Sequence, residues 1–442
     1  MNFSNNNKYF SILEEKIESK NIKVAIVGMG YVGLPLALSF ANAGIEVLGI
    51  DIDAQKIKII NSGKSPLKQI PHETVEYLVT KGRFTVSEQF LGIQKCDAVI
   101  ICVPTPLNKH REPDLSFITS TLKSIKKHLI KGQILSLEST TYPETTEEII
   151  LPFIQEQNLT IGEEFFLVYS PERQDPGRED FTTETIPKVL GGTTEKCTII
   201  GSKLYQLAIK TIVNVKDTKT AEFTKLFENI QRSVNIGLVN ELKILADKMN
   251  IDIYEVISAA ATKPFGFIPY YPGPGLGGHC IPIDPFYLTW KAKEYGINTK
   301  FIELAGEINK AMPLYVVSKL IDGLNQQQKS LKGSKILILG LSYKKNIDDM
   351  RESPSIEIIN ILISKGALVD YSDPFFDEMP KSRNTTHKCK NIELSSDNLL
   401  TYDGLLLSTD HDCYDYDFIL KHSKLIIDTR GRFSNHKKVV RA

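Results

Sequence analysis

Short apolar runs separated by segments with helical spacing dominate the first half of the chain. Lys23 to Val27 is a β-branched run typical of a buried strand, and Glu46 to Ile50 is another. Between them, Leu34 to Ala43 carries apolar residues at helical spacing, and Gly44 follows where such a helix should end. Strand, helix and strand in this order predict a βαβ unit with parallel strands.

Three further runs of the same kind follow, and each ends in polar residues. They are residues 97–103, 133–140 and 165–172. In an open parallel sheet, ligands bind outside the carboxyl ends of the strands. We therefore expect Thr105, Thr140 and Glu172 to lie near a cofactor or substrate, with ordinary loop capping as the alternative for each.

From about Asp217 the pattern changes to one long proline-free helical stretch. A helix of about 30 residues would be about 45 Å long, and a helix of that length usually bridges domains or subunits. Lys225, Asn229 and Arg232 fall on one face of it because of their spacing. A solvated polar face is the alternative interpretation.

A second strand–helix series begins at Lys335. Gly340 ends its first strand, but the full GxGxxG pattern is missing, and GLLLSTD and KLIIDTRGRF supply two more strands. The predicted fold is α/β: two Rossmann-like doubly wound domains joined by a central helical domain with a long helix. The predicted parts are a polar N-terminal extension (1–20), a cofactor domain (21–216), a helical dimerisation and catalytic domain (217–315) and a second Rossmann-like domain (316–442).

Charge and hydropathy exclude several classes of function. Lysine plus arginine equals aspartate plus glutamate, 53 each, so no basic excess points to nucleic acid or to an anionic membrane. The first twenty residues lack the apolar core of a signal peptide, and no apolar run approaches the roughly 20 residues that span a bilayer. We expect a cytoplasmic protein.

The cysteines do not suggest a metal site. The six are scattered with no CxxC pair, which suits neither zinc nor a disulfide framework. Cys102 lies in an apolar run and reads as a core residue. Cys280 differs, because it lies in the glycine-rich stretch GPGLGGHCIPIDP, where it could be a nucleophile or an inert thiol in a turn.

The turn that follows the first predicted strand, Lys23 to Val27, carries a dinucleotide-binding pattern. Gly28, Gly30 and Gly33 form GxGxxG between strand and helix, and Asp51 follows Gly33 by 18 residues. The glycines allow a tight turn, close approach of a pyrophosphate and helix–strand packing, while the acid suits ribose hydroxyls. Asp51 would repel a 2′-phosphate, which favours NAD over NADP. Lys56, one turn into the next helix, tempers this preference slightly.

An NAD site together with an activated cysteine favours one class of chemistry. A thiolate can capture the aldehyde that a first alcohol oxidation produces, and a second oxidation gives a thioester that water cleaves to a carboxylate. Such a reaction needs a group for the alcohol proton and a donor for the oxyanion. Lys225 with Asn229 could supply both, and Asp284 could orient them.

The whole chain resembles the UDP-sugar 6-dehydrogenase family, to which UDP-glucose dehydrogenase belongs. The matching runs are VGMGYVGLPLA, EST, SPER, AEFTKLFEN, GPGLGGHCIPID, GLSYKKNIDDMRESPS and DTRGR, in that order. The resemblance implies an NAD-binding domain, a helical core that forms a homodimer and a C-terminal domain that binds the UDP moiety. It also implies oxidation of a C6 alcohol to a carboxylate with two NAD per turnover.

The resemblance assigns roles to residues of this sequence. Cys280 matches the nucleophile, Lys225 the acid/base lysine, Asn229 the oxyanion-stabilising amide, and Asp284 and Glu172 the acids that place water and protons. The expected cofactor site comprises Gly28, Gly30, Tyr31, Val32, Gly33, Asp51, Lys56, Thr105, Thr140 and Arg351, and Thr140 is also expected to take part in catalysis. The expected substrate site comprises Glu172, Arg173, Lys225, Asn229, Arg232, Tyr270, Tyr271, Gly277, Tyr343, Lys344 and Arg430.

One departure from the glucose-specific pattern bears on the substrate. Glucose-specific members usually carry a lysine just before the aspartate of the cysteine motif, whereas this chain has Ile283. HCIPIDP and SPERQDPG are more similar to the branch that acts on UDP-N-acetylglucosamine. UDP-N-acetylmannosamine and UDP-glucose stay open as substrates, since no physical argument from sequence fixes the C2 configuration.

The role of His279 stays open. It could transfer a proton beside Cys280, although adjacent residues in an extended turn usually point apart.

Two other functions are alternatives to this reaction. The chain could bind a nucleotide sugar without oxidising it, or stop after one hydride transfer. Cys280, Lys225 and Asn229 argue against both of these functions.

Overall fold

The computed structural model describes residues 8–442 except 68, 109, 175–180, 279–280 and 381–387. The chain divides into two compact units. The first comprises residues 1–228 and 286–296, and the second comprises residues 229–285 and 297–442.

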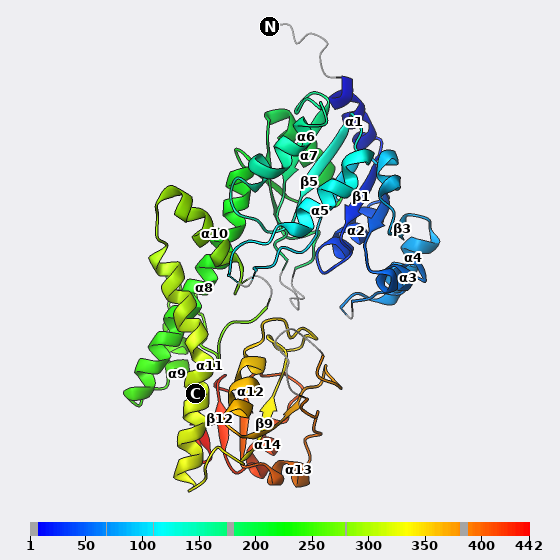
Figure 1. The fold of residues 1–442 in the computed structure, drawn as a ribbon. Helices are drawn as coiled ribbons and strands as arrows, with labels where there is room; N and C mark the ends of the chain where they lie inside the picture. The colour runs from blue at the N-terminus through cyan, green and yellow to red at the C-terminus, as the bar shows by residue number, and fades with distance from the viewer. Residues whose placement is uncertain (1–7, 68, 109, 175–180, 279–280, 381–387) are drawn as a thin grey trace. The chain divides into compact units, whose positions relative to one another are not determined.

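The first unit is built on a sheet in the order β3-β2-β1-β4-β5-β6-β7-β8, parallel except where β7 runs antiparallel to β6 (Figure 1). Its strands are β1 Lys23–Val27, β2 Glu46–Ile50, β3 Phe84–Ser87, β4 Ala98–Ile101, β5 Gln133–Leu137, β6 Phe165–Tyr169, β7 Lys188–Gly192 and β8 Ile212–Asn214. Its helices are α1 Lys8–Glu18, α2 Gly33–Asn42, α3 Ala54–Asn61, α4 His72–Thr80, α5 Ser116–Ile125, α6 Leu151–Gln155 and α7 Glu195–Gln206.

The sheet of the first unit is covered on both faces. Val24 and Ile26 of β1 belong to one apolar core, while Ala25 and Val27 belong to another, because successive strand residues point to opposite faces. Helices α1, α2 and α7 contribute to the first core, and α5 contributes to the second. The predicted doubly wound arrangement is confirmed here.

Helix α1 was not foreseen from the polar N-terminal sequence. Residues 8–18 form an amphipathic helix that buries Leu13 and Ile17 in the first core. Glu14 and Glu18 of α1 both form ion pairs with Lys203 of α7. This part of the N-terminal stretch is therefore packed against the first unit.

The second unit holds a smaller sheet with the order β10-β9-β11-β12-β13, all parallel. The strands are β9 Lys335–Leu339, β10 Leu368–Ser372, β11 Gly404–Leu407, β12 Ile426–Asp428 and β13 Val439–Arg441. The helices are α9 Ile253–Ala261, α11 Lys300–Gln326, α12 Pro354–Ser364, α13 Ser396–Thr401 and α14 Tyr416–His422. Ile336 and Ile338 face one core and Leu337 and Leu339 the other, so this sheet is also covered on both faces.

Two helices contain residues of both units. α8 (Thr218–Lys248) is the predicted long helix, with 31 residues, and the division falls between Glu228 and Asn229. α10 (Asp284–Ala292) starts in the second unit and continues in the first. The fold class of two parallel-sheet domains with a helical central part is confirmed.

Candidate active site

The turn after β1 has the geometry of a dinucleotide-binding loop. Gly28 has a φ of +98°, and a Cβ there would lie 2.6 Å from the carbonyl oxygen of Cys102. A Cβ on Gly33 would lie 1.8 Å from the Gly28 carbonyl oxygen, so the start of α2 packs directly on the turn. Gly30 has no atom within 4 Å of its Cβ position. Space beside Gly30 fits the close approach of a pyrophosphate.

Asp51 lies at the end of β2 with both carboxylate oxygens engaged. One accepts hydrogen bonds from the Met29 N–H and the Lys56 ammonium, both at 2.8 Å, and the other accepts from the Asp53 N–H. Burial would raise the pKa of Asp51, but these bonds, the one from Lys56 first, hold it below its ordinary value. Lys56 therefore pairs directly with the acid, a closer relation than the sequence spacing indicated.

The loops after β4 and β5 are tied together at the carboxyl edge of the sheet. Ser139 donates a hydrogen bond to the Val103 carbonyl oxygen at 2.6 Å. Thr105 is buried, and its carbonyl oxygen accepts a bond from the Tyr287 hydroxyl at 2.9 Å. Thr140 is half-buried beside Ser139. Both threonines thus lie at the edge where the sequence predicted them.

Glu172 follows β6 and is held by the backbone of its own turn. One carboxylate oxygen accepts hydrogen bonds from the N–H groups of Arg173 and Gln174 at 2.8 and 2.7 Å. The other lies 3.6 Å from the ammonium of Lys188. Arg173 forms an ion pair with Glu228 of α8 at 2.6 Å. A small cavity of about 10 Å³, lined in part by Glu172 and Lys188, is the size of one water molecule.

Lys225 and Asn229 lie one turn apart on α8, and both are buried, at 8% and 4% exposure. The alternative of a solvated face therefore fails for these two, whereas Arg232 is half-buried. Asn229 donates a hydrogen bond from its amide nitrogen to Asp284 at 2.5 Å. This bond fixes which end of the amide is the donor and leaves a second N–H on the same nitrogen. Lys225 makes no hydrogen bond or ion pair with any other residue that the structure describes.

The glycine-rich segment passes close to other elements of the second unit. A Cβ on Gly277 would lie 2.5 Å from the Cβ of Tyr343, and the Gly278 N–H donates to the Arg351 carbonyl oxygen. A Cβ on Gly273 would lie 2.8 Å from the guanidinium of Arg430. These glycines permit backbone approaches that side chains would block. Cys280 and His279 lie outside the described residues.

The other predicted substrate residues of the second unit, and Arg351 of the predicted cofactor site, have the following surroundings. The Tyr270 hydroxyl donates to the Gln231 side chain, and Tyr271 is exposed. Arg430 donates to the Ser408 carbonyl oxygen, and Arg351 pairs with Asp349 at 2.6 Å. Tyr343 and Lys344 are half-buried in the loop that follows β9.

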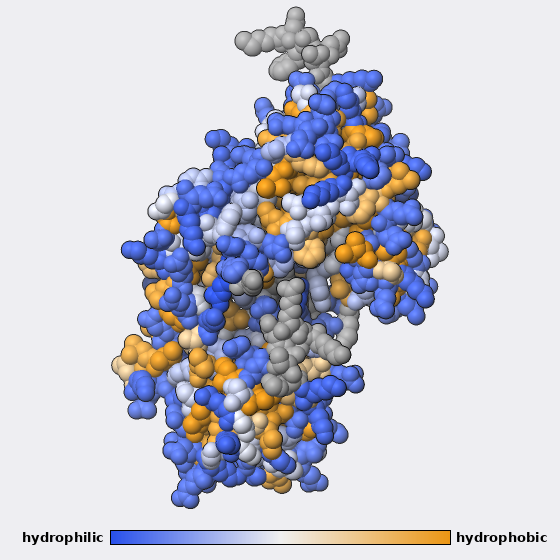
Figure 2. Space-filling model, in the orientation of Figure 1, coloured by the Kyte–Doolittle hydropathy of each residue, from blue (hydrophilic) through white to orange (hydrophobic). Residues whose placement is uncertain are grey.

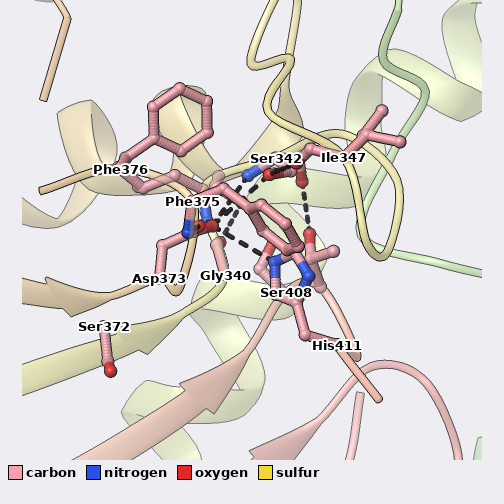
Figure 3. A network of polar contacts seen from close by, with 12 residues as sticks. Gly340, Ser342, Ile347, Ser372, Asp373, Phe375, Phe376, Ser408 and His411 are labelled. Carbon is pink, nitrogen blue, oxygen red and sulfur yellow. Dashed lines mark hydrogen bonds and ion pairs between the residues drawn. The ribbon is translucent and has the colours of Figure 1, made fainter. Parts of the chain in front are cut away.

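The turn after β9 in the second unit resembles the turn after β1 in the first unit. The Gly28 N–H bonds to the last residue of β2, and the Gly340 N–H bonds likewise to the last residue of β10. Asp373, like Asp51, follows that strand and accepts N–H bonds from the turn, here from Leu341 and Ser342 (Figure 3). The two strand–helix series therefore share this turn geometry, although the second lacks the full GxGxxG pattern.

Asp373 differs from Asp51 in what lies beside its carboxylate. The cation partner of Asp51 is a part-exposed lysine, whereas the imidazole of the fully buried His411 lies 3.2 Å from Asp373. The rings of Phe375 and Tyr414 pack against His411. Burial would raise the pKa of Asp373, but the hydrogen bond and charge of His411 hold it below its ordinary value. This acid is built into the core of the second unit.

Several buried polar residues of the first unit were not predicted from the sequence, and four of them lie at or near the candidate site. Glu222, on α8 one turn before Lys225, accepts bonds from the Glu144 and Thr146 N–H groups. The others are Glu138, Lys188 and Tyr205, which form a cluster beside Glu172. The glutamate in EST, placed at a strand end, was the available signal for that cluster.

In the described part of the chain, no three His, Cys, Asp or Glu side chains are grouped in a way that could hold a metal ion. Within the same residues, none of the helices combines the length and the hydropathy required to cross a bilayer.

Comparison with known proteins defines the class. The sequence signatures of the UDP-glucose/GDP-mannose dehydrogenase family match in order: its NAD binding domain at residues 22–209, its central domain at 219–311 and its UDP binding domain at 337–435. The chain belongs to this family. It is an NAD-dependent UDP-sugar 6-dehydrogenase.

Relatives with different sugar substrates are similarly close. The UDP-N-acetyl-D-glucosamine 6-dehydrogenase of Pseudomonas aeruginosa is 36% identical over 394 residues, which cover 89% of this chain and 91% of the relative. The UDP-N-acetyl-D-mannosamine dehydrogenase of Pyrococcus horikoshii is 33% identical over 418 residues, 93% and 96% of the two chains. The solved UDP-N-acetyl-mannosamine dehydrogenase Cap5O from Staphylococcus aureus superposes with a TM-score of 0.79 at 32% identity, covering 95% of this chain and 97% of that one.

Proposed function

We propose that this chain is a cytoplasmic UDP-N-acetyl-D-glucosamine 6-dehydrogenase that converts the C6 alcohol into a carboxylate. The product, UDP-N-acetyl-D-glucosaminuronate, would serve as a precursor of surface polysaccharides. Ile283, at a position where glucose-specific members usually carry lysine, is the observation that favours an N-acetylated sugar. Relatives named for the N-acetylglucosamine substrate are 36% and 35% identical, and those named for N-acetylmannosamine are 30–34% identical.

The proposed mechanism assigns one task to each of a few residues. Gly30 and Asp51 would help to hold NAD, which would supply the hydride acceptor for both oxidations of C6. Lys225 would take the C6 hydroxyl proton as the first hydride leaves, which gives the aldehyde. The Cys280 thiolate would add to this aldehyde, and the resulting alkoxide would take a proton to become a thiohemiacetal. Loss of that proton and of the second hydride would leave a thioester. Water then cleaves the C–S bond, giving the carboxylate and the free thiol.

Two charged or polar groups on α8 would assist these steps. The Lys225 ammonium and the second N–H of the Asn229 amide suit an oxyanion at C6, since both are buried where water screens little. The bond to Asp284 supports this role for Asn229, because it holds the amide in one orientation. Glu172 would place the hydrolytic water.

Stoichiometry and substrate choice test the proposal together. With excess NAD and limiting UDP-N-acetylglucosamine, we expect two NADH per sugar, measured by absorbance, and a uronic acid product, measured by mass spectrometry. UDP-N-acetylmannosamine and UDP-glucose, run side by side, should react at least about tenfold more slowly. A ratio of one NADH per sugar would contradict the two-step oxidation, and a faster reaction with either other sugar would contradict the substrate assignment.

We also propose that the chain acts as a homodimer through α8 and α9. Leu238, Leu242 and Leu245 are exposed and fall on one stripe of α8 by their spacing, and the exposed Met249 follows directly after the helix. Figure 2 shows further apolar side chains around α9, where Val256 is exposed. A second copy of the chain would cover this apolar surface, as the family resemblance implies.

A charge placed in the stripe should separate the two copies. Leu242→Glu is expected to reduce the mass measured by light scattering from two chains to one, because it would bury an unpaired carboxylate in the interface. Lys58→Glu, a charge change at an exposed residue of α3 outside both α8 and α9, should leave the mass unchanged. A wild-type protein of single-chain mass would show the dimer proposal to be wrong.

A further inference from the structure

A buried charge cluster lies inside the first unit at the carboxyl ends of β5 and β6. The Lys188 ammonium donates to Glu138 at 2.8 Å and lies 3.6 Å from Glu172. The side chains of Glu138, Lys188 and Glu172 are 0%, 5% and 13% exposed. Tyr205 donates to the other oxygen of Glu138 at 2.6 Å. Two carboxylates thus share one ammonium almost out of contact with water.

The sheet topology explains why these residues meet. Glu138 directly follows β5, and β7 begins at Lys188 and runs antiparallel to β6. Val168 pairs with Gly192 and Tyr169 with Gly191, so the register extended past β6 sets residue 172 opposite residue 188. The Ser170 hydroxyl, which donates to the Val189 carbonyl oxygen at 2.8 Å, continues this pairing. The position of Lys188 relative to Glu172 is therefore fixed by the backbone.

The contact between Lys188 and Glu172 is electrostatic. At 3.6 Å it is too long for a hydrogen bond, and the Lys188 hydrogen bonds go to Glu138 and the Pro171 carbonyl oxygen. Burial alone would lower the pKa of Lys188, but the charges of Glu138 and Glu172 raise it above its ordinary value. Lys188 is therefore a permanent cation beside the oxygen of Glu172 that the Arg173 and Gln174 N–H groups do not bind.

We infer that Lys188 is a positioning residue, which keeps the Glu172 carboxylate ionised and in one place, against the opposing charge of Glu138. The inference deepens the proposed function and rests on it, since it assumes that Glu172 places the hydrolytic water. Lys188 attracts the Glu172 carboxylate, and Glu138 repels it where Glu138 is ionised, since burial raises the pKa of Glu138. We therefore expect removal of Lys188 to favour protonation of Glu172, and removal of the Glu138 charge to oppose it.

The test measures the acidic limb of the pH profile of kcat for UDP-N-acetylglucosamine, since thioester hydrolysis follows both hydride transfers. Lys188→Met should move this limb upward by about 1 to 3 pH units, because Glu172 would lose a cation within 4 Å. Glu138→Gln should move it downward, because the repelling carboxylate is gone. Lys188→Arg should return the limb to within half a unit of wild type. Shifts in one direction for both charge-removing variants, or no shifts, would overturn the inference.

A matched control separates this effect from the loss of any buried lysine. Lys291, also in the first unit, is 3% exposed and pairs with Glu144, Glu148 and Glu294. Lys291→Met should lower the melting temperature without moving the acidic limb. If Lys291→Met moves the limb as far as Lys188→Met does, the positioning role is wrong.

A second readout does not depend on activity. In Lys188→Met, the folded state would hold the carboxyl groups of Glu138 and Glu172 without their cation, so ionising them would cost stability that the unfolded state does not lose. Stability should therefore fall as pH rises above the ordinary glutamate pKa. The melting temperature should therefore drop more steeply between pH 5 and 8 than in wild type, and Glu172→Gln in the same chain should restore part of the slope. If the melting temperature shows this steeper fall with pH but the wild-type protein does not oxidise UDP-sugars, only the proposed function is wrong. If the pH dependence of the melting temperature is the same in Lys188→Met as in wild type, the role of Lys188 is wrong.

Discussion

Replacement of Cys280 by alanine is expected to abolish formation of the uronic acid. Loss of an essential nucleophile costs on the order of 10⁴-fold or more in kcat, because the residues around it cannot substitute for the covalent step. Binding of NAD should survive, since the GxGxxG turn and Asp51 belong to a separate part of the chain. Product formation is measured by mass spectrometry and NAD binding by calorimetry.

The other cysteines make the Cys280 experiment selective. Burial raises the pKa of Cys96 to about 12 and of Cys389 to about 11, and it raises that of Cys102 as well. These thiols stay protonated at neutral pH and are poor nucleophiles. Cys413→Ala, which removes an exposed thiol, is the control and should retain wild-type activity. Uronic acid formation at the normal rate in Cys280→Ala would show the nucleophile assignment to be wrong.

Replacement of Gly33 by alanine should have the second largest effect, on the cofactor. The new Cβ would lie 1.8 Å from the Gly28 carbonyl oxygen, so the turn and the start of α2 must separate. Overpacking of this kind costs about 1–3 kcal/mol of the free energy of unfolding. We expect a lower melting temperature and NAD affinity reduced at least about tenfold, as about 1.4 kcal/mol of binding energy corresponds to one factor of ten.

Gly30→Ala serves as the matched variant for Gly33→Ala. Nothing lies within 4 Å of a Cβ at Gly30, so the melting temperature should stay near the wild-type value. Binding of NAD should nevertheless weaken, because the methyl group occupies space that a pyrophosphate would need. If Gly33→Ala kept both its stability and its NAD affinity, the packing role of this glycine would be refuted.

Local patterns carried most of what the sequence could predict. The βαβ unit, the long helix α8 and the second strand–helix series follow from apolar periodicity and glycine placement, which depend on neighbouring residues. The short strands β3, β8 and β13 were missed because runs of three or four residues carry little periodicity. The antiparallel β7 was missed as well, since its pairing with β6 depends on a register that no local pattern encodes.

In the candidate site, too, residues related by local spacing were predictable, and residues brought together by the sheet were not. The turn with Gly28 and Gly33, and the face with Lys225 and Asn229, could be read from spacing. The cluster of Glu138, Lys188 and Tyr205 could not, because its members lie 50 and 67 residues apart in sequence. Their partnership depends on which strands become neighbours in the sheet. Buried charges paired across strands leave no spacing signature.

The segment of residues 286–296 has a consequence for how the protein folds as it is made. Tyr287 bonds to the loop after β4, and Lys291 pairs with Glu144 and Glu148, so the segment completes the first unit although the second unit has begun before it. During synthesis, the first unit therefore cannot close until residue 296 has left the ribosome. Ribosome-bound chains that end near residue 228 should expose the surface that Tyr287 and Lys291 later cover, and should be more sensitive to protease than chains extended past residue 296.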